Sequence, residues 1–200
     1  TLGANGKLGR VEGGTSNDAR IGARIGIKPA SNLQVSLEPS LSTRHSYAQW
    51  VENQDTNDDG DDDRFVFGEL DQDVFELGAR VSLAFTTTLS IQGYVQSFVT
   101  NGDYVAFKEL ARERSYEFTP VAATELSENP DFSNRSLRGN MVLRWEYEPG
   151  STLFIVWSQN RRESFDSDEP EFTPFASAWD SFTDDGEDVF LVKLNYWLGL

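Results

Sequence analysis

The stretch SLRGNMVLRWEYEPGSTLFIVWSQN, residues 136–160, contains two apolar-rich runs joined by a short connection. In the first run apolar side chains occupy every second position, at Met141, Leu143, Trp145 and Tyr147. A period of two predicts a β-strand with one apolar and one polar face. Pro149 followed by Gly150 supplies the fixed and the free φ angle that a tight turn requires. The stretch therefore predicts a β-hairpin.

The rest of the chain repeats this plan. About eight strands are expected, over residues 1–12, 19–28, 33–50, 64–85, 89–99, 136–147, 151–160 and 188–200. Their connections alternate in length, with short turns near residues 30, 87 and 149 and long loops at 53–63, 101–134 and 163–187. In an up-and-down meander, all short turns and both termini then lie at one end. This sorting is typical of outer-membrane barrels.

The sequence thus predicts an all-β fold, an antiparallel up-and-down transmembrane β-barrel, with the whole chain, 1–200, as a single barrel region. Its strands reach about ten residues, which matches a tilted membrane span. Aromatic side chains such as Trp145 and Tyr147 fall near strand ends, where aromatic girdles meet lipid headgroups. The same alternation also fits a soluble β-sandwich whose apolar face is its core, and that alternative stays open.

Composition narrows the function classes. The formal net charge is −16, which argues against a nucleic-acid partner because phosphates would be repelled. Two segments, 52–73 and 163–188, each hold ten acidic residues. No apolar run reaches the roughly 18 residues of a transmembrane helix. The chain has no cysteine, so it contains no disulfide and a zinc-thiolate site is excluded.

Charged side chains of both signs lie on the polar faces of the expected strands. The candidates to face a barrel lumen are Arg20, Arg24, Glu76, Arg80, Arg144, Glu146 and Lys193. They fit a pore lining or the binding site of a polar ligand. They fit equally well a salt-bridged plug that only fills the barrel.

The acidic loop resembles the first half of a calcium-binding loop. Its oxygen-bearing side chains alternate, at Asp55, Asn57, Asp59, Asp61 and Asp63. Such spacing lets oxygen ligands surround Ca²⁺, and Gly60 permits the sharp turn. Val66 stands at the twelfth position, where a bidentate Glu is expected. A solvated acidic turn explains the same residues without a metal.

Four phrases resemble a known bacterial family of uncharacterised function: RFVFGELDQD (64–73), GDYVAFKELARERSYEF (102–118), residues 129–161 and DVFLVKLNYWLGL (188–200). In that family a module similar to family 9 carbohydrate-binding domains precedes a large C-terminal domain expected to be an outer-membrane β-barrel. The resemblance implies that this chain is the C-terminal part of a larger barrel. The resemblance assigns no catalytic residue to this sequence.

Three functions follow as hypotheses. The first is a non-enzymatic outer-membrane barrel with periplasmic termini, which anchors a protein and binds or passes carbohydrate or another polar solute. Its partners would be outer-membrane lipid and, during biogenesis, the barrel-assembly machinery. The second is a secreted, soluble β-rich binding or adhesion domain with calcium-ordered acidic loops. The third is part of a glycan-acting enzyme, although no G-x-S-x-G, H-E-x-x-H or phosphate-loop motif is present.

Overall fold

The chain forms one antiparallel β-sheet, as its alternating pattern predicts. The computed structural model describes residues 1–200 except 12–14, 59, 61–63, 113, 166–172 and 199–200. The strands are β1 (Leu2–Val11), β2 (Ser16–Ala30), β3 (Leu33–Gln54), β4 (Arg64–Ala84), β5 (Leu89–Leu110), β6 (Phe118–Val121), β7 (Phe132–Glu148), β8 (Ser151–Phe165) and β9 (Gly186–Asn195). Two short helices are η2 (Ala123–Glu125) and α1 (Pro174–Asp180). The all-β, antiparallel expectation is confirmed, with nine described strands.

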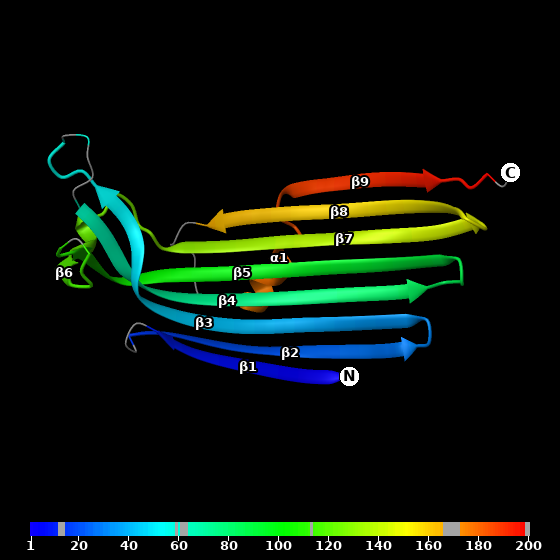
Figure 1. Cartoon of the computed structure of the whole chain (residues 1–200), viewed down its shortest axis with the longest axis horizontal. Coiled ribbons are helices and arrows are strands. Elements are labelled where there is room, and N and C mark those ends of the chain that lie inside the picture. Colours follow the sequence, from blue (N-terminus) through cyan, green and yellow to red (C-terminus); the bar gives the residue numbers. More distant parts are fainter. Residues whose placement is uncertain (12–14, 59, 61–63, 113, 166–172, 199–200) are drawn as a thin grey trace.

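The strands follow one another as an up-and-down meander. Their order is β1-β2-β3-β4-β5-β7-β8-β9, and the short β6 pairs with β5 beside β7. The turns between β2 and β3, β4 and β5, and β7 and β8 lie at one end of the sheet, and β1 begins and β9 ends on the same side (Figure 1). The sheet is open, because β1 and β9 are its two edges. The observed sheet is not closed, so the barrel stays a prediction.

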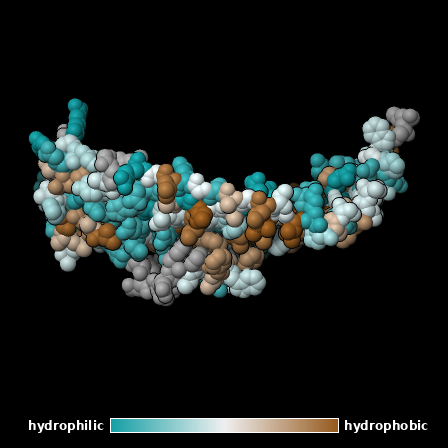
Figure 2. All heavy atoms as spheres, turned by 90° about the horizontal axis from the view of Figure 1, so that it is seen from below, coloured by the Kyte–Doolittle hydropathy of each residue, from teal (hydrophilic) through white to brown (hydrophobic). Residues whose placement is uncertain are grey.

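The sheet is a curved shell with unlike faces. Antiparallel neighbours that pair directly share a face. Ser40 pairs with Glu76 and both are polar, whereas Leu41 pairs with Phe75 on the other face. Figure 2 shows the shell edge-on, hollow on one side, with hydrophobic side chains gathered mainly in the middle of its length. The polar face is concave and the apolar face is convex.

Strands β3, β4 and β5 continue past the ends of their neighbours and form an extension at the loop end, which β6 joins (Figure 1). A small core holds it together, with Val66 completely buried and Val121 nearly so. The Lys108 ammonium lies 3.1 Å from the centre of the Tyr47 ring and 3.0 Å from the Glu69 carboxylate. Tyr47 therefore lies in this extension, beyond the apolar region of the strands.

The predicted loop over 101–134 is wrong for much of its length, because β5 continues to Leu110 and β7 begins at Phe132. Outside the apolar region both strand faces are polar or mixed, so no alternation marks the strand. A Cβ built on Gly102 would lie 2.4 Å from the Phe132 ring. The glycine therefore makes room for an aromatic ring across the sheet and does not mark a loop.

One further expectation changes. The long connection at 163–187 is shorter than predicted, because β8 continues to Phe165 and β9 begins at Gly186, with α1 between them. At the predicted loop over 53–63, β3 continues to Gln54 and β4 begins at Arg64, while residues 59 and 61–63 lie outside the described part of the chain. No helix among the described residues is long and apolar enough to cross a membrane.

Candidate functional site: the concave polar face

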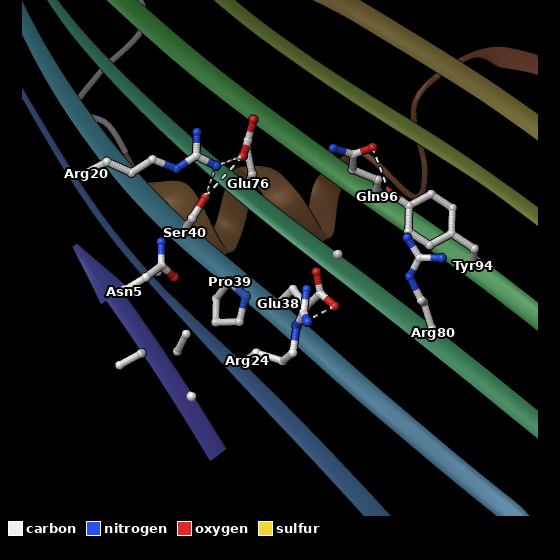
Figure 3. Close-up of a pocket in the computed structure, with 15 residues that line it drawn as sticks. Asn5, Arg20, Arg24, Glu38, Pro39, Ser40, Glu76, Arg80, Tyr94 and Gln96 are labelled. Atoms are coloured by element: carbon white, nitrogen blue, oxygen red, sulfur yellow. Dashed lines mark hydrogen bonds and ion pairs between the residues drawn. The ribbon is translucent and has the colours of Figure 1, made fainter. Parts of the chain in front are cut away.

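A hollow of about 400 Å³ lies on the concave face over strands β1 to β5 (Figure 3). Four of the predicted lumen-facing residues line it, namely Arg20, Arg24, Glu76 and Arg80. They meet because they alternate on β2 and β4, two strands that lie on either side of β3. The sequence predicts that these four side chains share the polar face of the sheet. They line one hollow on that face, which agrees with the prediction.

The first ion pair in the hollow joins β2 to β4 across β3. The Arg20 guanidinium donates to the Glu76 carboxylate at 2.5 Å. Between them lies Ser40, whose hydroxyl accepts from Arg20 at 3.0 Å and donates to Glu76 at 3.1 Å (Figure 3). The Ser40 hydroxyl, on the intervening strand, therefore contacts both members of the directly paired Arg20 and Glu76.

The neighbouring charges have different partners. Arg24 pairs with Glu38 at 3.1 Å. The Arg80 guanidinium lies 4.4 Å from the centre of the Tyr94 ring, whose hydroxyl donates to Gln96 at 2.8 Å. A guanidinium over an aromatic face is attracted by the ring quadrupole, and it keeps its outer N–H groups free for another acceptor.

The other three predicted residues lie away from this hollow. Arg144 and Glu146, two positions apart on β7, pair with each other at 3.0 Å. Lys193 lies on the edge strand β9, opposite Phe154. The seven predicted residues therefore form two separate groups and one edge residue, and they do not converge on a single centre.

The concave face also carries arginines outside that predicted set. A second hollow, of about 490 Å³, is lined by Arg138, Arg162, Gln96, Thr100 and other residues of β5, β7 and β8. Arg162 pairs with Ser136 across the sheet, so it lies on the polar face. Neither Arg138 nor Arg162 forms a salt bridge with a described carboxylate. Their position in the alternating pattern of 136–162 was the signal that could have identified them.

At the loop end, Arg64 connects β4 to two other elements. Its Nε donates to Glu109 at 2.5 Å and its Nη1 donates to Glu125 of η2 at 2.9 Å. The hydrogen bond from Arg64 lowers the pKa of Glu125 below its usual value. This pairing fastens η2 to the extension.

The proposed calcium loop is only partly described. Asp55 and Asn57 are seen, and the Asp55 carboxylate accepts a hydrogen bond from the Gly60 N–H at 2.8 Å. Asp59, Asp61 and Asp63 lie outside the described residues. Within the described part of the chain, no group of three or more acidic or histidine side chains is placed to hold a metal ion. The lone His45 instead has its Nδ1 2.7 Å from the Asp71 carboxylate.

The convex face carries an apolar belt, defined as the run of apolar side chains on that face of each strand from β2 to β9. One row of paired residues crosses it: Ile27, Val35, Val81, Gly93, Met141, Trp157 and Phe190. Many side chains of the belt are exposed, among them Ile21 at 65%, Phe190 at 72% and Val192 at 67%. Soluble monomers rarely leave so continuous an apolar face open to water.

The belt crosses the sheet obliquely. On β2 it extends from Ile27 toward the loop end as far as Ile21, whereas on β9 it extends from Phe190 toward the turn end as far as Leu194. The loop-side limit thus shifts by six residues between β2 and β9, over six interstrand steps. Six residues measure about 20 Å and six steps about 29 Å, so on this side the strands are inclined by about 35° to the perpendicular of the belt.

Comparison with family models adds one finding. A model described as "Domain of unknown function (DUF5916)" matches residues 5–200. The chain belongs to the DUF5916 family. No curated protein and no solved structure matches it. The DUF5916 match supports the resemblance to an uncharacterised family and assigns no activity to the concave face.

Proposed function

We propose that this DUF5916 chain is part of a β-barrel that spans the bacterial outer membrane, with the convex belt against lipid and the concave face toward the lumen. The oblique apolar belt is the observation that carries the proposal. Strands of membrane barrels tilt by about 35–45° from the barrel axis, and on the loop side of the belt the strands are inclined by about 35° to its perpendicular.

The dimensions of the belt support the same function. On β7 it extends from Leu137 to Tyr147, and the ten residue-to-residue steps between them cover about 33 Å along the strand and about 27 Å across the belt. The apolar band of an outer-membrane barrel is about 25 Å tall. Trp145 and Tyr147 lie at the turn end, where the inner aromatic girdle would meet the headgroups. The turns and both termini would then be periplasmic.

The role that fits this arrangement is non-enzymatic. The chain would anchor a longer protein, and its concave face would bind or pass a polar solute such as a carbohydrate. The supporting features are the two polar hollows, the Arg80–Tyr94 contact and the arginines Arg138 and Arg162. In the full-length protein a carbohydrate-binding module would precede this chain, as the sequence resemblance implies, and the open edges β1 and β9 would pair with further strands of the larger barrel.

The membrane proposal is tested on the full-length protein after extraction in detergent. A folded membrane barrel migrates differently on a denaturing gel before and after boiling, because its hydrogen-bonded sheet resists the detergent. We expect this heat-dependent migration, and we expect aggregation once detergent is withdrawn. A protein that stays monomeric without detergent and migrates alike in both samples would instead be the soluble β-rich alternative.

A further inference from the structure

The helix α1 packs on the convex face and not over the hollow. Figure 1 shows it behind β4 and β5, on the side away from the viewer. Its Ala178 is buried against Phe75 of β4 and Val99 of β5. The rings of Phe175 and Phe75 lie 4.9 Å apart. Four apolar side chains thus attach a seven-residue helix, which is too short to be stable alone.

Polar contacts fasten the end of this segment. The Asp184 carboxylate accepts two hydrogen bonds from the Arg135 guanidinium, at 2.5 and 2.6 Å, and its side chain is only 3% exposed. Arg161 donates to the Asp184 carbonyl at 2.8 Å. The Ser181 hydroxyl is completely buried and donates to the Ala178 carbonyl at 2.7 Å. The segment therefore has a defined position on the sheet.

Although the segment is fixed, its largest aromatic side chains face outward. Phe175 is 73% exposed, Trp179 75% and Phe182 46%. The rings of Trp179 and Phe182 lie 5.8 Å apart and form one exposed pair. In water this exposure is unfavourable, whereas Trp and other aromatic rings are enriched where a bilayer changes from hydrocarbon to headgroups.

The position of α1 along the strands agrees with a boundary between hydrocarbon and headgroups. Phe75 and Val99 are the last belt residues on β4 and β5 toward the loops. Two residues further along the same face stand Asp73 and Asn101, which pair with each other. The helix therefore covers the line at which the convex face changes from apolar to polar.

We propose that α1 and the following Phe182 form an interfacial anchor, with Trp179 and Phe182 inserted among the lipid headgroups of the outer leaflet. This inference rests on the proposed membrane function. The partner is lipid because the aromatic pair continues the belt that the barrel presents to the bilayer. A second copy of the chain or a soluble protein would be a different occupant, and the test below separates them.

Residues 1–200 contain no cysteine, so a single cysteine introduced there can be labelled uniquely once any cysteine elsewhere in the full-length protein is replaced by serine. An environment-sensitive dye would be placed at Phe182→Cys, with Trp179→Cys as a second variant. Two further variants serve as references: Ile155→Cys places the dye in the belt, and Thr119→Cys places it in the extension, outside the belt. The proteins are refolded into phosphatidylcholine vesicles that carry nitroxide quenchers either near the headgroup or deep in the acyl chain.

The expected result is a gradient of quenching. The dye at 155 loses most fluorescence to the deep quencher, the dye at 182 to the shallow quencher, and the dye at 119 to neither. If 155 is quenched while 182 and 179 behave like 119, the anchor is wrong and the membrane function stands. If 155 is not quenched either, both are wrong. Shielding at 182 that grows with protein concentration and not with lipid would indicate a second copy and overturn the lipid assignment.

Discussion

The Arg135 guanidinium binds the Asp184 carboxylate through two hydrogen bonds, of 2.5 and 2.6 Å, across 49 residues of sequence. Glu163 adds a third contact to Arg135, at 3.1 Å. All three residues lie at the loop side of the belt, next to the segment that carries α1. The helix is therefore attached to β7 by charge as well as to β4 and β5 by apolar contacts.

Replacing Asp184 with Asn should release this attachment. The substitution leaves the partly buried Arg135 paired with Glu163 at 3.1 Å and, more distantly, with Asp180 at 4.0 Å. A buried hydrogen bond to a charged group contributes about 1.5–3 kcal/mol. We expect the free energy of local opening of α1 to fall by about that amount, measured by hydrogen exchange of residues 174–184.

The control for Asp184→Asn is Glu117→Gln, which breaks the exposed pair between Arg112 and Glu117. Surface pairs contribute about 0–1 kcal/mol, so this variant should exchange almost as the unmodified protein does. Equal exchange of α1 in the Asp184→Asn and unmodified proteins would show that the apolar contacts alone hold the helix.

Acid should loosen η2 from the extension. The hydrogen bond from Arg64 lowers the pKa of Glu125, so the folded pKa lies below the unfolded value of 4.5. The stabilisation is present above that unfolded value and is lost as the pH falls through the folded one. A dye on Ala123→Cys should therefore gain mobility, seen as lower fluorescence anisotropy, as the pH falls from about 7 to about 3.

A Glu125→Gln variant separates this effect from general acid unfolding. Its η2 should already be mobile near pH 7, and its anisotropy should change little with acid. If the two proteins lose anisotropy together over the same pH range, the pairing with Arg64 does not hold η2.

The hollow should show coupling between Arg20 and Glu76. Their side chains are 46% and 28% exposed, so solvent screens the pair and we expect a coupling of about 0.5–1 kcal/mol. The measurement is a double-mutant cycle with Arg20→Gln and Glu76→Gln in a refolding titration. The more exposed pair Arg24–Glu38 should give a smaller value, and a coupling near zero for both pairs would mean that the network adds nothing to stability.

The sequence was informative where one face of each strand is apolar. There the strict alternation of side chains identified β2, β7 and β9 and assigned Arg20 and Glu76 to a common polar face. It failed in the part of β5 that belongs to the extension, where neither face is apolar and Gly102 looked like a loop residue. It also missed α1, because seven residues with no repeating apolar stripe carry no helical period.

The grouping of the polar residues was not predictable either. Alternation gives the face of a side chain but not its partner, since the partner depends on register. Only the structure shows that Ser40, which pairs with Glu76 across the sheet, also accepts a hydrogen bond from Arg20, and that Arg162 joins Arg138 in a second hollow. The sequence therefore predicted the face, and the register determined the site.

The most direct test of the membrane belt compares two neighbouring residues on β7. Leu143 pairs with Ile91 and Ile155 in the belt, whereas Val142 pairs with Gln92 and Val156 on the concave face. Both residues are half-buried, and each would be replaced by Arg in the full-length protein.

Refolding titrations into lipid vesicles give the free energy of folding of each variant. Leu143→Arg should lose about 2–4 kcal/mol, because it places a charge against hydrocarbon near the middle of the membrane. Val142→Arg should lose much less, because its charge enters the polar lumen. A neutral Leu143→Arg, or a larger loss for Val142→Arg, would contradict the orientation of the sheet and with it the membrane function.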